Sequence, residues 1–386
     1  MGWALKPFGD IAKFKNGKSI KPGLSGEFPV YGANGIIGGA NEWVYESSLI
    51  LGRVGAYCGA VELCEGRFWP SDNTIVVQAV EDSVTLKFLY YLLKHADLNR
   101  YAGGAAQPLL TQSRLKPIEF LIPPLAVQSQ IASILSVYDD LIENNTRRIE
   151  ILEEMARRLY EEWFVQFRFP GHEGVEFKES EFGFIPEGWD FLPLGDIYRT
   201  GSGGTPSRKN PDFYGSDYRW VKTKELQDCP VFDTEERISE EGLKKSSAKL
   251  FPRNTVLIAM YGATIGRLGV LQEESATNQA CCAILPNSQG CGWGYAYLSL
   301  FSRRQALIDL RAGAAQQNIS QDVIKKFRLL RASDEVHEQF EMAVTPFLTL
   351  CFALYRKNAN LRAQRDLLLP KLISGEIDVS DIPMPT

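Results

Sequence analysis

The residues with the clearest chemical potential are polar and basic side chains in two glycine-rich parts of the chain. The candidates in the first part are Lys18, Lys21, Tyr31, Asn34, Arg53 and Arg67. Those in the second part are Thr205, Ser207, Arg208, Lys209, Lys222 and Lys224. Arg and Lys suit phosphates and guanine edges, whereas Asn suits adenine, so the chemistry these residues could perform is contact with DNA. The competing interpretation for any one of them is an ordinary solvated surface residue.

Motifs that could support catalysis are incomplete. Asn210-Pro211-Asp212-Phe213 is similar to the Asn-Pro-Pro-aromatic loop of amino-methyltransferases, but Asp212 replaces a proline and no glycine-rich S-adenosylmethionine loop accompanies it. Gly201-Ser202-Gly203-Gly204 lacks the Gly-Lys-Ser/Thr ending of a phosphate loop. The pairs Asp139-Asp140 and Glu153-Glu154 lie in a helical pattern, where adjacent side chains diverge by about 100° and cannot jointly hold a metal. We therefore expect no catalytic residues and no bound cofactor or metal.

Cysteine and histidine usage points to a reduced, cytoplasmic protein. The seven cysteines form no Cys-x-x-Cys spacing, and the three histidines lie near no cysteine cluster, so a zinc site or a disulfide framework is not expected. No apolar run approaches the roughly 20 residues that span a bilayer, and the N-terminus has no signal-peptide core.

An internal repeat organises the chain of 386 residues. Residues 2–11 and 188–197 share Gly, Trp, Pro, Gly, Asp and Ile at the same spacing, and Gly104-Ala105-Ala106-Gln107 recurs at 313–316. The second copy is longer between these anchors, and so long a period indicates a duplicated domain. Asn73 and Asn278 also recur, as do Gln107 and Gln316, which favours a shared scaffold role such as buried hydrogen bonding.

Each copy begins with short strand-like runs separated by turn-forming residues and ends in a long helical stripe of apolar residues. Each helix would be roughly 60 Å long. Because neither is stable alone with its apolar stripe exposed, we expect the two helices to pack against each other as an antiparallel, coiled-coil-like pair. Pro346 predicts a kink or a late start in the second helix. The expected fold is α+β, with two globular domains separated by these helices and related by a pseudo-two-fold repeat. The expected segments are a first globular domain at 1–122, a first helical region at 123–170, a linker at 171–187, a second globular domain at 188–331 and a second helical region at 332–386.

The net charge of −5 is unevenly distributed between the expected segments of the chain. Residues 1–122 carry 12 Lys and Arg against 11 Asp and Glu, and residues 188–331 carry 19 against 15. The globular domains are therefore mildly basic, and the helices and linker are acidic. This charge distribution excludes a protein that binds DNA through a uniformly basic surface. It does not exclude two domains that each present a basic face to DNA.

Several segments together resemble the specificity subunits of type I restriction–modification systems. The first is Pro123–Leu135, followed by Asp139-Asp140-Leu141-Ile142-Glu143-Asn144-Asn145. The others are Leu159–His172, Gly183–Trp189 and Leu367–Ile377. The resemblance covers essentially the whole chain and both repeats.

This resemblance implies a non-catalytic subunit in which each globular domain is a target-recognition domain for one half of a bipartite, asymmetric site in double-stranded DNA. It implies helices that set the half-site spacing and dock two methyltransferase subunits, with no contact to a membrane. S-adenosylmethionine would be bound by those partners, and ATP and Mg by restriction subunits where these exist.

Two other interpretations stay open from the sequence. One is a duplicated protein-interaction scaffold without DNA affinity. The other is a fused methyltransferase or nuclease, which would need a catalytic region of several hundred further residues.

Overall fold

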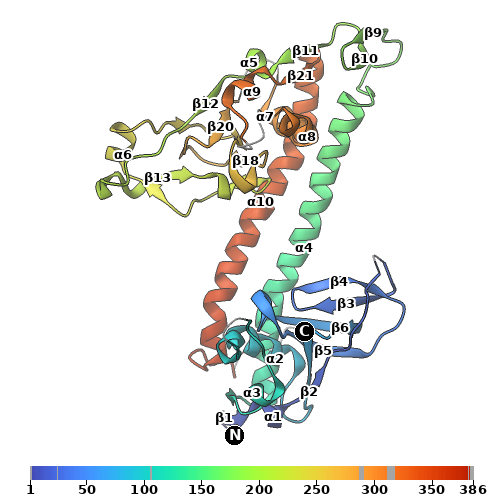
Figure 1. The fold of residues 1–386 in the computed structure, drawn as a ribbon, viewed down its shortest axis with the longest axis vertical. Helices are drawn as coiled ribbons and strands as arrows, with labels where there is room; N and C mark the ends of the chain where they lie inside the picture. The colour runs from blue at the N-terminus through green and yellow to red at the C-terminus, as the bar shows by residue number, and fades with distance from the viewer. Residues whose placement is uncertain are drawn as a thin grey trace. The chain divides into compact units, whose positions relative to one another are not determined.

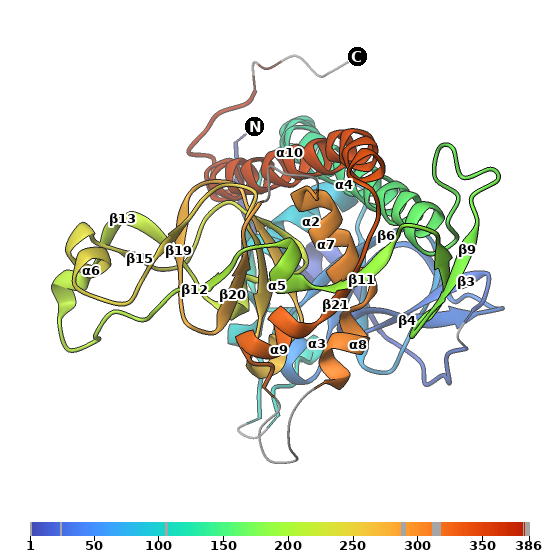
Figure 2. The ribbon, with the colours of Figure 1, turned by 90° about the horizontal axis from the view of Figure 1, so that it is seen from above.

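The computed structural model describes residues 2–23, 25–104, 107–286, 291–310, 318–380 and 382. The chain forms two compact units (Figure 1, Figure 2). Unit 1 joins Met1–Glu143 to Ala359–Thr386, and unit 2 comprises Asn144–Asn358. Each unit therefore contains one copy of the repeat and a part of each long helix. The sheets and helices together confirm the expected α+β class.

Unit 1 is built on a six-stranded sheet with the order β2-β7-β5-β6-β3-β4. Its strands are β2 (Ala12–Asn16), β3 (Phe28–Gly32), β4 (Gly35–Ala40), β5 (Tyr45–Gly52), β6 (Val61–Pro70) and β7 (Thr74–Ala79). A separate antiparallel pair joins β1 (Ala4–Pro7) to β8 (Glu119–Ile122). The short helices are α1 (Phe8–Ile11), α2 (Leu86–His95) and α3 (Gln112–Leu115), with 3-10 turns η1 (Gly55–Tyr57) and η2 (Leu98–Tyr101).

The central strands of unit 1 are apolar on both faces because both faces are covered. Ile75 and Val77 of β7 belong to the main core together with residues of α2, while Val76 packs in a smaller core on the opposite side with Phe68. Helix α2 begins where the Thr85 hydroxyl accepts a hydrogen bond from the Phe88 amide at 3.4 Å, a standard N-cap.

Unit 2 contains a five-stranded sheet with the order β12-β20-β17-β18-β14. Its strands are β12 (Thr200–Ser202), β14 (Cys229–Val231), β17 (Val256–Ala259), β18 (Leu268–Leu271) and β20 (Cys281–Ile284). Two antiparallel pairs flank it, namely the hairpin of β9 (Phe177–Ser180) with β10 (Gly183–Pro186) and the pair of β11 (Asp190–Pro193) with β21 (Arg328–Arg331). The short helices are α5 (Leu194–Ile197), α7 (Trp293–Ser302), α8 (Arg304–Asp309) and α9 (Gln321–Lys326), with 3-10 turns η3 (Pro211–Phe213), η4 (Thr223–Glu225) and η5 (Gly262–Thr264).

The two sheets show that the sequence repeat is a structural repeat. The order β2-β7-β5-β6 in unit 1 corresponds to β12-β20-β17-β18 in unit 2. Each sheet then adds a parallel strand beside this common set, β3 on β6 and β14 on β18.

Unit 2 contains a second sheet as well. Its four strands have the order β15-β13-β19-β16, with β13 at Tyr214–Val221, β15 at Arg237–Ile238, β16 at Leu250–Phe251 and β19 at Ser275–Thr277. Helix α6 (Glu240–Lys244) follows β15 and is capped by the Ser239 hydroxyl, which accepts from the Gly242 amide at 3.0 Å.

The recurrent asparagines differ from expectation. Asn73 is exposed, so the buried hydrogen bonding expected of it is wrong; its backbone carbonyl accepts from the Arg53 amide at 3.0 Å. Asn278 is half-buried, and its Oδ1 accepts from the Ala280 amide at 3.1 Å, a local turn contact. Gln316 lies outside the described residues.

The long helices are α4 (Leu125–Phe164) and α10 (Asp334–Ile373), each of 40 residues. In unit 1, Asp139 of α4 pairs with Arg365 of α10 at 2.5 Å. In unit 2, Asn145 bonds Asn358, and the ring of Trp163 lies 5.6 Å from that of Phe340. From Asp139 through Asn145 to Trp163 of α4, the contacted residues of α10 run backwards from Arg365 through Asn358 to Phe340. This order confirms the antiparallel pairing of the two helices.

Pro346 does not delay the second helix. Helix α10 begins at Asp334 and continues through Pro346, so the alternative of a late start is wrong. The residues on both sides, Val344 and Leu348, are buried in the core of unit 2, and this tertiary packing offsets the one backbone hydrogen bond that a proline removes.

Gly17, at the end of the first sheet strand, is expected to tolerate no side chain. A Cβ there would lie 1.8 Å from the Ser71 carbonyl oxygen, a backbone atom that cannot rotate away. Gly17→Ala is expected to destabilise unit 1 by about 1–3 kcal/mol, seen as a lower thermal midpoint by circular dichroism. Gly66→Ala is the matched control, since nothing lies within 4 Å of its Cβ position. Equal midpoints for the two variants would contradict this packing argument.

Candidate nucleic-acid interface

Three of the predicted contact residues of unit 1 are gathered by one turn, the segment between β6 and β7. The Lys18 amide donates to the Pro70 carbonyl at 2.9 Å, the Ser71 amide donates to the Tyr31 carbonyl at 2.8 Å, and the Arg53 amide donates to the Asn73 carbonyl at 3.0 Å. The Trp69 indole also donates to the Lys18 carbonyl at 3.1 Å. Residues far apart in sequence thus meet at one end of the sheet.

Asn34 belongs to the same end of the sheet. It is exposed in the turn between β3 and β4, and its neighbour Ala33 packs so closely on Gly52 that a Cβ at Gly52 would meet the Ala33 carbonyl at 2.7 Å. Lys21 is exposed in the segment that joins β2 to β3. We name Lys18, Tyr31, Asn34 and Arg53 the first cluster.

The side chains of the first cluster are not equally available. Tyr31 is half-buried, its ring stands edge-on to Phe68 at 5.6 Å, and burial raises the pKa of its phenol, so it can act only as a neutral group. Arg53 is also half-buried, and its Nε has no hydrogen-bond partner among the described residues. A buried guanidinium donor without a partner is costly, so Arg53 is the member best prepared to receive an external acceptor.

Arg67 lies apart from the first cluster, further back along β6. Its guanidinium pairs with Glu46 at 3.4 Å and lies 4.7 Å from the ring of Trp43. Trp43 is 40% exposed, an unusual position for an indole. Trp43 was not predicted as a contact from the sequence, where its position among turn-forming residues was the one signal for it.

In unit 2 the glycine-rich loop after β12 is anchored by aromatic residues. The buried Trp220 indole donates to the Gly204 carbonyl at 3.0 Å, and the Tyr214 hydroxyl donates to the Pro206 carbonyl at 2.7 Å. The exposed Thr205 hydroxyl donates to Gln279 Oε1 at 2.5 Å. The loop is therefore held in a defined conformation.

Three predicted cations of unit 2 converge on two carboxylates. Arg208 pairs with Glu236 at 2.6 Å, and Lys222 pairs with Glu236 at 2.5 Å and with Glu235 at 3.1 Å. Lys224 also pairs with Glu235. We name these five residues the second cluster. Its three cations were predicted from the sequence, but its two carboxylates were not.

Aromatic rings complete the second cluster. The Arg208 guanidinium lies 4.3 Å from the ring of Tyr214 and 5.4 Å from that of Trp220. Hydrogen bonds from Arg208 and then Lys222 lower the pKa of Glu236 to about 2. Ser207 accepts from the Lys209 amide at 3.4 Å within the same loop, and both are exposed.

Equivalent loops of the repeat contribute to both clusters. Lys18 lies two residues after the end of β2, and the loop with Thr205 and Arg208 begins directly after β12. Each loop is anchored through a glycine amide, because the Gly17 amide donates to the Thr74 carbonyl at 3.1 Å and the Gly204 amide donates to the Thr277 carbonyl at 3.0 Å. One scaffold position therefore presents different side chains in the two units.

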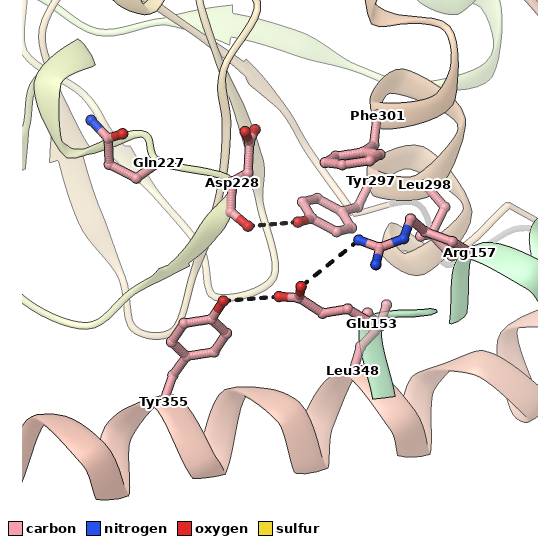
Figure 3. A pocket seen from close by; sticks show the side chains of 9 residues that line it. All are labelled: Glu153, Arg157, Gln227, Asp228, Tyr297, Leu298, Phe301, Leu348 and Tyr355. Carbon is pink, nitrogen blue, oxygen red and sulfur yellow. Dashed lines mark hydrogen bonds and ion pairs between the residues drawn. The ribbon is translucent and has the colours of Figure 1, made fainter. Parts of the chain in front are cut away.

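Unit 2 also contains a polar cavity of about 150 Å³, lined by Glu153, Arg157, Gln227, Asp228, Tyr297, Leu298, Phe301, Leu348 and Tyr355 (Figure 3). Its polar groups pair with one another: the Tyr355 hydroxyl donates to Glu153 Oε1 at 2.9 Å, and the Tyr297 hydroxyl donates to the Asp228 carbonyl at 2.9 Å (Figure 3). Burial raises the pKa of Tyr297, so this phenol stays protonated and serves as a donor. The cavity is a polar junction between α7 and the two long helices.

Within the described ranges, no group of three or more His, Cys, Asp or Glu side chains could hold a metal ion. Among the same residues, no helix is long and apolar enough to cross a membrane.

Two domains with the same central sheet order and a pair of long helices define a duplicated α+β protein, and equivalent loops of its two domains carry different basic side chains. The chain belongs to the family described as Type I restriction modification DNA specificity domain, which matches residues 1–154 and 186–330. The resemblance found in the sequence is thereby confirmed.

Curated relatives and a solved structure agree with this assignment. The Type I restriction enzyme MjaIX specificity subunit of Methanocaldococcus jannaschii is 27% identical over 318 residues, covering 78% of this chain and 71% of the relative. The HindI specificity subunit of Haemophilus influenzae is 26% identical over 371 residues, covering 80% and 81%. The crystal structure of a type I restriction–modification system S subunit from M. genitalium superposes with a TM-score of 0.71 at 16% identity, covering 96% of each chain, and so supports the fold.

Glu236 is expected to stabilise unit 2 in a pH-dependent way. Its pKa falls from 4.5 to about 2 on folding, so its contribution is full above about pH 4.5 and is lost as the pH falls towards 2. Glu236→Gln should therefore cost about 1 kcal/mol at pH 7, allowing for solvent screening, and nothing near pH 2.

Thermal melts of both proteins between pH 7 and pH 2.5 measure this difference. Glu240→Gln is the control, because Glu240 pairs with Lys244 on an exposed helix face and should cost only a few tenths of a kcal/mol. A difference between wild type and Glu236→Gln that stays constant across this pH range would contradict the assigned pairing.

Proposed function

We propose that this chain is the DNA-recognition subunit of a type I restriction–modification complex, in which each globular domain reads one half of a bipartite, asymmetric site. The observation that carries the proposal is that equivalent loops of the repeat contribute to two different clusters. A shared scaffold positions each loop against DNA in the same way, while different donors and acceptors select different bases.

The two clusters engage DNA by different routes in this proposal. Arg53 of the first cluster offers a half-buried donor without a partner among the described residues. Arg208 and Lys222 of the second cluster are already paired with Glu236, so a DNA phosphate must displace a carboxylate there. Lys21, Arg67, Thr205, Ser207 and Lys209 remain candidate contacts at the edges of the two clusters.

The long helices act in this proposal as the spacer between half-sites and as the docking surface for two methyltransferase subunits. The chemistry then lies with the partners: methyltransferase subunits use S-adenosylmethionine to methylate adenine, and restriction subunits, where present, use ATP and Mg to translocate and cut DNA. The incomplete catalytic motifs of this chain and the family assignment support a role without catalysis.

Gel-shift titration of the chain co-expressed with its methyltransferase partner tests the proposal, with sites taken from methylome sequencing of the host with and without the gene. A bipartite methylation motif that disappears with the gene, and a selective shift of that motif, are expected. Assembly with the partner but no selective shift would support the scaffold interpretation instead. Methylation by this chain alone would support the fused-enzyme interpretation.

Removing one cation from each cluster is expected to weaken binding without preventing assembly. Lys18→Ala and Arg208→Ala should each weaken DNA binding about 3- to 10-fold. The slope of the logarithm of the binding constant against the logarithm of the salt concentration should fall by about one in magnitude, which corresponds to the loss of one phosphate contact. Alanine is preferred to charge reversal at Arg208, because an acidic side chain there would repel Glu236.

Lys326→Ala is the matched control, since this exposed lysine pairs with Asp322 on α9. Binding is measured by fluorescence anisotropy at several salt concentrations, and assembly by size-exclusion chromatography. Loss of assembly in Lys18→Ala or Arg208→Ala would assign these residues a structural role.

Lengthening both long helices is expected to change the spacing but not the half-sites. Inserting seven residues after Glu143 and seven after Asn358 keeps the apolar stripes in phase and adds about 10 Å, close to three base pairs. Methylome sequencing should then report the same half-sites with a longer spacer. Altered half-sites with an unchanged spacer would refute the spacer role.

A further inference from the structure

The interface between α4 and α10 contains a buried polar layer. Asn145 and Asn358 are 3% and 2% exposed, and Asn145 Nδ2 donates to Asn358 Oδ1 at 2.9 Å. Asn358 Nδ2 donates in turn to the Thr146 hydroxyl at 3.2 Å. A buried amide is unfavourable unless it is hydrogen-bonded, so this layer is stable only because the two asparagines face each other.

The repeat places an apolar layer at the equivalent position. Counted from the first residue of each helix, Asn145 of α4 and Leu354 of α10 are both twenty-first, and Ile149 of α4 and Asn358 of α10 are both twenty-fifth. Ile149 and Leu354 are each 5% exposed and belong to the same core. The two helices are therefore alike in length and pairing but differ in chemistry at these two positions.

This difference discriminates between partners. If α4 packed antiparallel on the α4 of a second copy in the same register, each Asn145 would face Ile149 instead of Asn358. Two copies of α10 would likewise place Asn358 against Leu354. Each self-pair would bury two amides without partners, and each such amide lowers the pairing constant about tenfold or more.

A second contact, in unit 1, discriminates in the same direction. Arg365 of α10 pairs with Asp139 of α4 at 2.5 Å, and the Tyr91 hydroxyl donates to the same carboxylate at 2.7 Å. By the same count, Asp139 corresponds to Leu348 and Arg365 to Ala156, both buried. Self-pairing would set a carboxylate against alanine, or a guanidinium against leucine.

We propose that the Asn145–Asn358 layer, reinforced by Asp139–Arg365, makes the two long helices of one chain select each other over the same helix of a second copy. The partner that α4 recognises is thus α10 rather than another α4, and linkage within one chain favours the α10 of the same copy. A self-paired assembly would combine two identical domains, whereas the selected pair keeps two different domains together. The inference depends on helix packing alone and does not require DNA recognition.

The test removes the Asn145–Asn358 layer from the full-length chain, so that the two helices can no longer tell each other from a second copy of themselves at this position. The double variant Asn145→Leu/Asn358→Ile gives each helix the residues found at the equivalent positions of the other, so that cis pairs and self-pairs become equally apolar. Two differently tagged copies are unfolded together, refolded at several hundred micromolar and captured through one tag. Linked segments compete at an effective concentration of roughly millimolar, so exchanged dimers of the variant reach a measurable fraction under these conditions.

Wild-type copies can be co-captured only by pairing α4 of one copy with α10 of the other, whereas the double variant can also pair each helix with itself. The double variant is therefore expected to give several-fold more co-capture than wild type, with a dimer mass by light scattering. Glu150→Leu/Lys357→Ile is the matched control, since it adds similar apolar side chains at exposed neighbouring positions and should stay at the wild-type level. Co-capture of the double variant equal to wild type would overturn the proposal.

A second variant tests the reinforcing contact independently. Asp139→Leu/Arg365→Ala gives each helix, at the positions of the Asp139–Arg365 contact, the residues found in the other helix, and it leaves both asparagines in place. Co-capture should therefore rise above the wild-type level, but by less than for the first double variant. No rise in either double variant would overturn the proposal even if one of them refolded poorly.

Discussion

The structure depends on the fact that neither long helix can bury its apolar stripe alone. Each helix has 40 residues and exposes too much apolar surface to be stable in isolation, so α4 and α10 must pair. Each globular domain then docks through one of its own helices on this pair. In unit 1 the α2 residue Tyr91 bonds Asp139, and in unit 2 the ring of the α7 residue Tyr295 lies 4.7 Å from that of Phe164. The helix pair is thus the base on which both domains are built.

The duplicated scaffold separates what must stay constant from what can vary. Strands such as β7 and β17 are buried on both faces, where a change of one methylene is felt, so the sheet order is the same in both units. The loops after β2 and β12 are constrained at their glycines and at the carbonyls that other residues bond, and their exposed side chains can vary. One of them contributes to a cluster that has an unpaired guanidinium nitrogen among the described residues, and the other to a cluster whose cations are paired with carboxylates. Their electrostatic responses to a phosphate backbone should therefore differ.

The repeat, the two long helices and their antiparallel pairing could be predicted because each leaves a periodic or recurrent pattern in the sequence. The carboxylates of the second cluster could not: Glu236 lies 28 residues from Arg208, and only the folding of β13 against β15 brings them together. Asn73 was misjudged because recurrence was equated with burial, whereas its contact with Arg53 is made by its backbone carbonyl. The late helix start that was one of the two alternatives predicted at Pro346 was wrong because tertiary packing outweighs local propensity.

A chain built from two related halves has a pairing problem that unrelated domains lack, because each helix also suits a copy of itself. The same polar layer that solves this problem also fixes the register. A slip of one heptad would move Asn145 from Asn358 to a position opposite Cys351 or Arg365, leaving both amides without their partner. Partner and register are thus chosen by one hydrogen-bonded layer near the middle of the helices. If the helices measure the distance between half-sites, this layer also sets that distance.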